Sequence, residues 1–206
     1  MISARDALER LKEGNRRFVA NTVNLEAKLD PVRRRELTAG QEPFAIILGC
    51  SDSRVPAELV FDQGLGDLFV IRVAGNIVAP SQIGSVEFAA DQFGTRLVVV
   101  MGHSQCGAVV ATVKELVERA GNPSPNLRSI VDRIRPSVES LLSGPAPKDA
   151  ESLVAQAVRA NVRATVNHLR HGSAILEKLI TDEGLLVIGA EYSLETGVVD
   201  FFYGIP

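Results

Sequence analysis

The sequence predicts an α/β fold, with a mainly parallel central sheet flanked by helices and preceded by an N-terminal helical arm. Several apolar runs are too short for helices and are typical of strands buried on both faces. Amphipathic stretches separate these runs, so that strands and helices alternate. The 206 residues are 46% hydrophobic and 23% charged, which suits one compact core. We therefore expect a single domain over 1–206, divided into an arm at 1–40 and an α/β core at 41–206.

The arm is predicted to hold two helices. In the first, apolar residues recur at spacings of three and four, which indicates an amphipathic helix: Ala7, Leu8, Leu11, Phe18 and Val19. The second is expected to have Asp30 as its cap, Pro31 in its first turn and Gly40 at its end. Its arginine run at 33–35 is interpreted as a solvated face, with anion binding as the alternative.

The core is predicted from its apolar runs, which indicate strands at 44–48, 68–73, 97–101 and 185–190. A helix at 81–92, with Ser81 as its cap and Gly94 as its stop, completes a βαβ unit with the second and third strands. Later helices are expected at about 106–120 and on either side of the loop at 143–147, the longer one at 151–171. A last strand at 198–203 would form a hairpin with 185–190 around residues 195–197.

Charge and hydropathy exclude several partners. The net charge is -3, so no overall field would attract nucleic acid or an anionic membrane. The first twenty residues are charged throughout, and no segment approaches the ~18 apolar residues that a membrane span requires. We therefore expect a cytoplasmic protein with neither nucleic acid nor a membrane as a partner.

Three candidate metal ligands follow two of the predicted strands. Cys50 comes after the strand at 44–48, and His103 and Cys106 come after the strand at 97–101. If these strands are neighbours, the three side chains converge at the carboxyl edge of the sheet, where ligands bind in such folds. Two thiolates and one imidazole form a zinc site with one open position, which is typical of catalytic zinc. The alternatives are buried core cysteines beside a loop histidine, or a redox cysteine pair.

A charged pair accompanies the first cysteine. Two thiolates cancel the charge of zinc, so a bound water needs help to lose its proton. Asp52 is placed to accept that water's hydrogen bond, and Arg54 is placed to hold Asp52 with a bidentate pair. The alternative is a structural salt bridge in a loop. A second metal site at His168 and His171 is less favoured than a solvated helix face.

These motifs resemble those of the β-class carbonic anhydrases, of the plant-like type. The resemblance is carried by the segments at 50–55 and 102–108, and it continues through 67–72, 85–89, 13–18 and 196–198. It implies zinc held by Cys50, His103 and Cys106, with Asp52 and Arg54 managing the water. The reaction implied is the reversible hydration of carbon dioxide to bicarbonate and a proton.

The resemblance also implies a substrate pocket at a subunit boundary. Gln41 is expected to donate a hydrogen bond to bound substrate, while Phe69 and Phe88 would line the apolar part of the pocket. The Gly107 amide is a further donor for bicarbonate. The family's N-terminal helices embrace a second subunit, which implies a homodimer or homotetramer; packing of the first helix on its own core is the alternative.

Three residues depart from patterns seen in the family. Phe88 replaces a tyrosine found in some relatives, Ala74 replaces a bulkier valine and widens the pocket, and Ile47 stands where bicarbonate-inhibited members have a tryptophan. That inhibitory site is therefore expected to be absent or altered. Carbon disulfide or carbonyl sulfide hydrolysis, and a zinc-containing sensory module without turnover, are competing functions.

Overall fold

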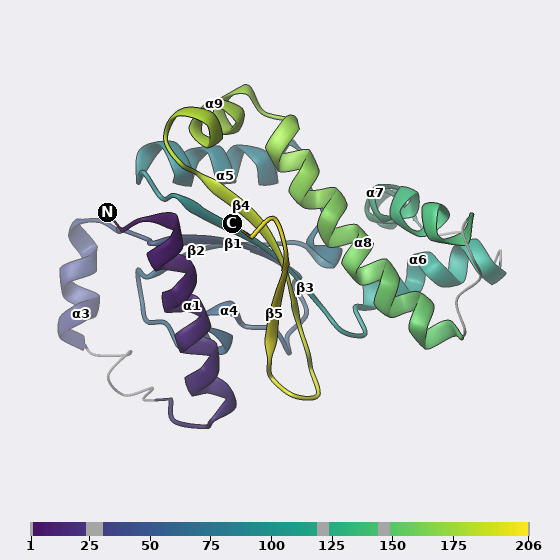
Figure 1. The fold of residues 1–206 in the computed structure, drawn as a ribbon, viewed down its shortest axis with the longest axis horizontal. Helices are drawn as coiled ribbons and strands as arrows, with labels where there is room; N and C mark the ends of the chain where they lie inside the picture. The colour runs from purple at the N-terminus through teal and green to yellow at the C-terminus, as the bar shows by residue number, and fades with distance from the viewer. Residues whose placement is uncertain (1, 24–30, 119–123, 144–148, 206) are drawn as a thin grey trace.

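The protein is built on a five-stranded sheet with strand order β2-β1-β3-β4-β5 (Figure 1). The computed structural model describes residues 2–23, 31–118, 124–143 and 149–205. The first four strands are parallel, and β5 pairs antiparallel with β4 at one edge. The strands are β1 (Ala45–Gly49), β2 (Leu68–Arg72), β3 (Leu97–His103), β4 (Leu186–Tyr192) and β5 (Val199–Tyr203). The predicted α/β class, the mainly parallel sheet and the closing hairpin are confirmed.

The order of the strands creates a crevice at the carboxyl ends of β1 and β3. The chain passes from β1 to β2 on one side, and then crosses to β3 on the other side of β1. In open α/β sheets, such a reversal of direction is where ligands bind. Gly49 and Met101 are the last register partners of β1 and β3, so the residues that follow them enter this crevice together.

Every residue of β1 and β3 is buried, because helices cover both faces of the sheet. One face packs against residues of α1 (Ala4–Val19) and α4 (Ala57–Val60). The other face packs against α5 (Pro80–Gln92), α8 (Ala150–His171) and α9 (Ala174–Asp182). A third apolar cluster joins α8 to α6 (Gly107–Glu118), α7 (Pro125–Leu142) and the 3₁₀ turn η2 (Ala74–Asn76). The remaining short elements are α3 (Pro31–Glu36) and η1 (Leu37–Ala39).

Helix α1 packs on the sheet of its own chain, which is the alternative that the sequence left open. A methyl group on Gly14 would lie 1.8 Å from the Phe61 carbonyl oxygen, so the helix backbone touches the core directly. Next to it, the buried Asn15 side chain donates to the carbonyls of Val60 and Gly197 and accepts from the Val199 amide. These contacts join α1 to α4 and to the β4–β5 hairpin.

Several predicted boundaries were wrong. Ser81 is not a cap: Pro80 begins α5, and Ala79 holds the cap position without a side-chain hydrogen bond. β3 continues past Met101 to His103 because β4 pairs with it along its whole length. Helices α4 and α9 were not predicted, although Ser173 caps α9 by accepting from the Leu176 amide.

Some other expectations fall on residues outside the described part of the chain, namely Asp30, the end of the helix at 119–120 and most of the loop at 143–147. The arginines at 33–35 are exposed on α3, as a solvated face requires. Within the described residues, no helix combines the length and apolar character that membrane crossing needs. The division into an arm at 1–40 and a core at 41–206 stays a prediction.

Candidate metal centre

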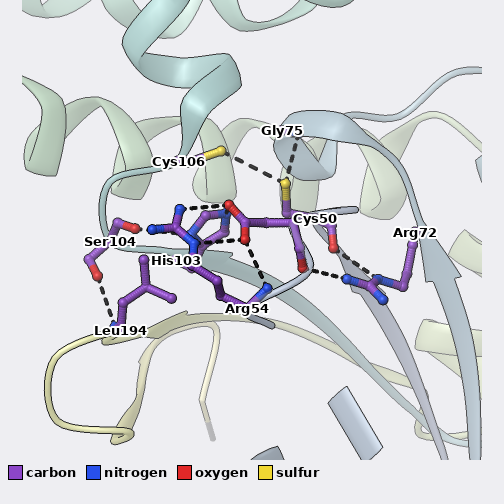
Figure 2. A network of polar contacts seen from close by, with 9 residues as sticks. Cys50, Arg54, Arg72, Gly75, His103, Ser104, Cys106 and Leu194 are labelled. Atoms are coloured by element: carbon purple, nitrogen blue, oxygen red, sulfur yellow. Dashed lines mark hydrogen bonds and ion pairs between the residues drawn. The ribbon is translucent and has the colours of Figure 1, made fainter. Parts of the chain in front are cut away.

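Cys50, His103 and Cys106 meet in the crevice at the carboxyl ends of β1 and β3 (Figure 2). Cys50 directly follows β1, His103 is the last residue of β3, and Cys106 immediately precedes α6. All three side chains are buried, and His103 is 0% exposed. Their ligating atoms lie within 4.8 Å of one another.

The spacing of the two sulfurs fits a shared metal ion. Cys50 Sγ and Cys106 Sγ are 4.0 Å apart. A tetrahedral zinc ion with bonds of ~2.3 Å to each sulfur would place them roughly 3.8 Å apart. A disulfide would need ~2.05 Å between the sulfurs, and both cysteines are free thiols here. The geometry therefore favours a metal ligand pair over a redox disulfide.

The histidine presents one nitrogen without a partner. His103 Nδ1 lies 2.9 Å from the Ser104 carbonyl oxygen, which can only accept, so Nδ1 carries the proton. Nε2 then holds a lone pair, and within the described part of the chain this buried atom has no hydrogen-bond partner. Metal-binding histidines are oriented in this way, with one nitrogen donating to an oxygen and the other free to bind. The residues present therefore fit a metal cation.

Without a metal, the two thiols share a proton. The hydrogen bond from Cys106 lowers the pKa of Cys50 despite the opposing effect of burial, and the Gly75 amide lowers it further. The same hydrogen bond, together with burial, raises the pKa of Cys106. A divalent cation would take the place of this proton and hold both sulfurs as thiolates.

Asp52 and Arg54 form the predicted pair beside the ligands. Arg54 Nε donates to Asp52 Oδ1 at 2.9 Å, and its terminal nitrogen NH2 donates to Oδ2 at 2.7 Å. This bidentate hydrogen bond is the main reason that the pKa of Asp52 lies well below its usual range. The same Oδ2 is 3.8 Å from His103 Nε2. A carboxylate held as an anion therefore lies beside the space that the three ligands enclose.

Arg72 organises the loop that carries both Cys50 and Asp52, and sequence reasoning gave it no role. Its Nε donates to the Cys50 carbonyl at 3.0 Å, and its NH2 donates to the Asp52 carbonyl at 2.6 Å. Arg72 ends β2 in register with Gly49, the residue before Cys50. The sequence does show Arg72 at the end of a predicted strand, which is a signal for a role at that edge of the sheet. Only the pairing of β2 with β1 shows that Arg72 reaches the loop with Cys50 and Asp52.

The hairpin between β4 and β5 fixes the loop that carries the histidine. The Ser104 amide donates to the Tyr192 carbonyl at 2.9 Å. The Ser104 hydroxyl accepts from the Leu194 amide, also at 2.9 Å (Figure 2). Ser104 also supplies the carbonyl that orients His103. The hairpin thus sets the direction in which the imidazole points.

Comparison with known proteins agrees with this geometry. A carbonic anhydrase family model matches residues 45–199. "Carbonic anhydrase 2" of Mycobacterium tuberculosis is 39% identical over 93% of this chain and 89% of its own length. A carbonic anhydrase of Mycolicibacterium smegmatis is 40% identical over 94% of this chain and 91% of its own length. The chain belongs to the β-carbonic anhydrase family.

Solved structures place the fold in the same family. A β-carbonic anhydrase of Aspergillus fumigatus superposes with a TM-score of 0.76 at 24% identity, covering 85% of this chain and 83% of the other. Tetrameric β-carbonic anhydrases of Sordaria macrospora give a TM-score of 0.74 at 24% identity, covering 86% of this chain and 89% of the other. The family match and the relatives at about 40% identity make the protein an enzyme of the carbonic anhydrase class, whose reaction is the reversible hydration of carbon dioxide.

The structure separates the expected pocket residues of this β-carbonic anhydrase into two groups. Ala74 lies in η2, and Gly107 begins α6 directly after Cys106, so both adjoin the metal centre. Gln41, by contrast, precedes β1, whereas Cys50 follows it. Five residues of strand span roughly 16 Å, so in a single chain Gln41 lies at the opposite end of the sheet.

The two phenylalanines lie nearer to that opposite end. Phe69 pairs with Ile46, near the start of β1, and its ring centroid is 6.3 Å from that of Phe88. Phe88 is 52% exposed, an unusual state for a large aromatic side chain. Both rings also pack against Phe93, which lines a surface cavity together with Gln41. One chain therefore does not bring Gln41, Phe69 and Phe88 to its own metal centre.

Proposed function

We propose that this β-carbonic anhydrase hydrates carbon dioxide with a zinc ion held by Cys50, His103 and Cys106. The observation that carries the proposal is the buried His103 Nε2, which has no hydrogen-bond partner among the described residues and faces a cluster with two sulfurs that are 4.0 Å apart. Three protein ligands leave a fourth tetrahedral position for water or substrate. Bound zinc would supply Lewis-acid activation of that water.

Asp52 and Arg54 are proposed as the catalytic pair that handles the water proton. The Asp52 carboxylate is an anion beside the ligand atoms, so it can only accept a hydrogen bond and thereby orients the reacting water. Arg54 binds both carboxylate oxygens and prevents the carboxylate from turning toward the cation. The Arg54 backbone amide also donates to Asp52 Oδ1 at 3.0 Å, which fixes the carboxylate on a second side.

We infer that a second copy of the chain completes the substrate pocket. Gln41, Phe69 and Phe88 lie away from the metal centre of their own chain, and Phe88 is exposed there. In a two-fold symmetric dimer, each copy can present these residues to the other's Cys50, His103 and Cys106. A homodimer or homotetramer follows, and the Sordaria macrospora relatives are described as tetrameric. Gln41 would then donate to the substrate, with Phe69 and Phe88 forming its apolar wall.

The remaining roles belong to the same proposal. The Gly107 amide, at the N-terminus of α6, is placed to donate to bicarbonate. Ala74 would leave space in the pocket beside η2. Carbon dioxide and bicarbonate are the proposed substrate and product, in a cytoplasmic setting.

The test combines metal analysis with stopped-flow carbon dioxide hydration. The purified protein should carry one zinc per chain and hydrate carbon dioxide. Cys106→Ser should lose most of its zinc and its activity, because a neutral hydroxyl is a far poorer zinc ligand than a thiolate. Full zinc occupancy in this variant would reject the ligand set. Activity in wild-type protein that contains no zinc would reject the proposal that hydration requires zinc.

A further inference from the structure

The Cys50 sulfur accepts a hydrogen bond from a backbone amide. The Gly75 N–H donates to Cys50 Sγ at 3.4 Å (Figure 2). Gly75 has a φ of 71° and Asn76 a φ of 42°, so two consecutive residues occupy the left-handed region. Asparagine tolerates this conformation better than other residues with a Cβ atom, and surrounding contacts hold Gly75 and Asn76 in it.

Helix α8 supplies those contacts. The Asn161 side chain donates from Nδ2 to the Gly75 carbonyl at 2.8 Å, and the Thr165 hydroxyl donates to the Asn76 carbonyl at 3.2 Å. Asn161 is 1% exposed, so water does not compete for its hydrogen bond. The two residues lie one turn apart on α8 and fix both left-handed residues of η2.

Steric contacts close the remaining side of Gly75. A methyl group there would lie 2.8 Å from Ile134 Cδ1 and 3.1 Å from Ala108 Cβ. The glycine is therefore held between α6 and α7 on one side and Asn161 on the other. The position of its N–H relative to Cys50 Sγ follows from this packing.

We propose that Asn161 is a positioning residue which, through Gly75, holds an N–H···S hydrogen bond on the Cys50 thiolate and limits the negative charge that this sulfur gives to the metal. The inference rests on the zinc site proposed above. Such a bond matters in this centre because two thiolates already neutralise a divalent cation. Hydrogen bonds to ligating sulfurs and other contacts around the ligands tune metal centres. Cys50 is buried and belongs to an apolar cluster with residues of α6, α7 and α8, and this exclusion of water strengthens the bond.

The first test uses the wild-type chain loaded with ¹¹³Cd. A scalar coupling between the Gly75 amide proton and cadmium, transmitted through the Cys50 sulfur, should appear in the NMR spectrum. Coupling from cadmium to the Cys50 β-protons shows that the metal occupies the site. With the metal in place, absence of the Gly75 coupling overturns this inference alone. Failure to bind any metal overturns the zinc site itself.

The second test removes the donor with Asn161→Leu, which keeps the number and branching of the side-chain heavy atoms. The variant should retain one zinc per chain, because its three ligands remain, and should lose about 10-fold in kcat/KM. A more electron-rich sulfur should move the sulfur-to-cobalt charge-transfer band of the Co(II) protein to lower energy. It should also raise the midpoint of the pH–rate profile.

Thr95→Val is the matched control. The buried Thr95 hydroxyl donates to the Pro43 carbonyl at 2.7 Å, near the opposite end of the sheet. This variant also removes one buried hydrogen bond to a carbonyl, and should lower stability without moving the cobalt band or the pH midpoint.

An unmoved band and midpoint in Asn161→Leu would overturn the inference. If Asn161→Leu does not fold, hydrogen-bond couplings in the wild-type protein decide, from cadmium to Gly75 and from Asn161 Nδ2 to the Gly75 carbonyl carbon.

Discussion

At the residue scale, two arginines that are not expected metal ligands hold the loop that carries Cys50 and Asp52. Arg54 and Arg72 bind different parts of the same loop: Arg54 holds the Asp52 side chain, and Arg72 holds the carbonyls of Cys50 and Asp52. The direction of the Asp52 carboxylate therefore depends on two cations from different segments. Loss of either is expected to reduce activity without removing a metal ligand.

Arg54→Ala should retain zinc and lose hydration activity by about 10²-fold, the scale of a positioned acid–base group. The reason is that Asp52 loses its bidentate partner and becomes free to turn toward the cation. Arg54→Lys is the informative comparison, because it keeps the charge but loses the planar fork, and should recover only part of the rate. Zinc content and stopped-flow rates measure both. Native rates in a zinc-loaded Arg54→Ala protein would contradict the role of the pair.

The lowered pKa of Asp52 also predicts how stability depends on pH. Its pKa lies below the unfolded value of about 3.9, so its ionised pairing with Arg54 stabilises the native state above that pH. As the pH falls below the unfolded value and through the lowered pKa, this contribution is lost. In metal-free protein, Asp52→Asn should therefore be less stable than wild type at neutral pH, and the difference should shrink in acid. Urea unfolding across this range measures it; a difference that grows in acid would refute the assignment.

At the scale of elements, the metal centre is assembled from segments fixed by helices and a hairpin. η2 is held by α8, the His103 loop by the β4–β5 hairpin, and that hairpin by α1 through Asn15. Helix α1 thus stabilises the β4–β5 hairpin of its own chain, and this role is independent of any contact that α1 makes in a dimer. Its contribution can be measured separately from catalysis.

Asn15→Ala should reduce the free energy of unfolding by about 3 kcal/mol, because it leaves one buried carbonyl, one partly buried carbonyl and one buried amide without their partner. Arg16→Ala is the control on the same helix. Arg16 is exposed, and among the residues that the structure describes its side chain has only a 3.8 Å ion pair with Glu13, so its loss should change stability by less than about 0.5 kcal/mol. Urea denaturation compares the two variants. Equal stabilities would show that Asn15 is not an anchor.

At the scale of the whole molecule, the expected pocket residues lie at two ends of the sheet, so one pocket that contains all of them needs a second chain. The metal centre lies at the carboxyl ends of β1 and β3, while Gln41 lies before β1. The exposed Phe88 and its aromatic neighbours form an apolar surface of the kind that a partner covers. A site shared between two chains therefore leads to a different experimental result from a site formed within one chain.

Mixing two inactive variants should restore activity. If Gln41 serves the partner's site, a heterodimer of Gln41→Ala and Cys106→Ser chains contains one site with all its residues intact. Random assortment should then return about a quarter of the native rate, since half the dimers are mixed and each has one working site. Stopped-flow assays of the co-refolded mixture, compared with each variant alone, measure this recovery. No recovery, with heterodimers present, would place Gln41 in its own chain's site.

The sequence by itself determined the fold class and the candidate ligands. Buried parallel strands are apolar along their whole length, and this local pattern marked β1 and β3 without knowledge of their partners. Because strands of a parallel sheet end at the same edge, Cys50, His103 and Cys106 could be expected to meet. Their residue types then indicated zinc.

Only the tertiary structure decided what surrounds those ligands. Asn161 lies 86 residues from Gly75, and Leu194 lies 90 residues from Ser104, so no local pattern links them. The predicted strand at 44–48 already separated Gln41 from Cys50, but only the structure placed Phe93 beside Gln41 in one surface cavity. The physical reason is that hydrophobic periodicity encodes which residues are buried, whereas the partners of a buried polar group depend on packing between distant segments.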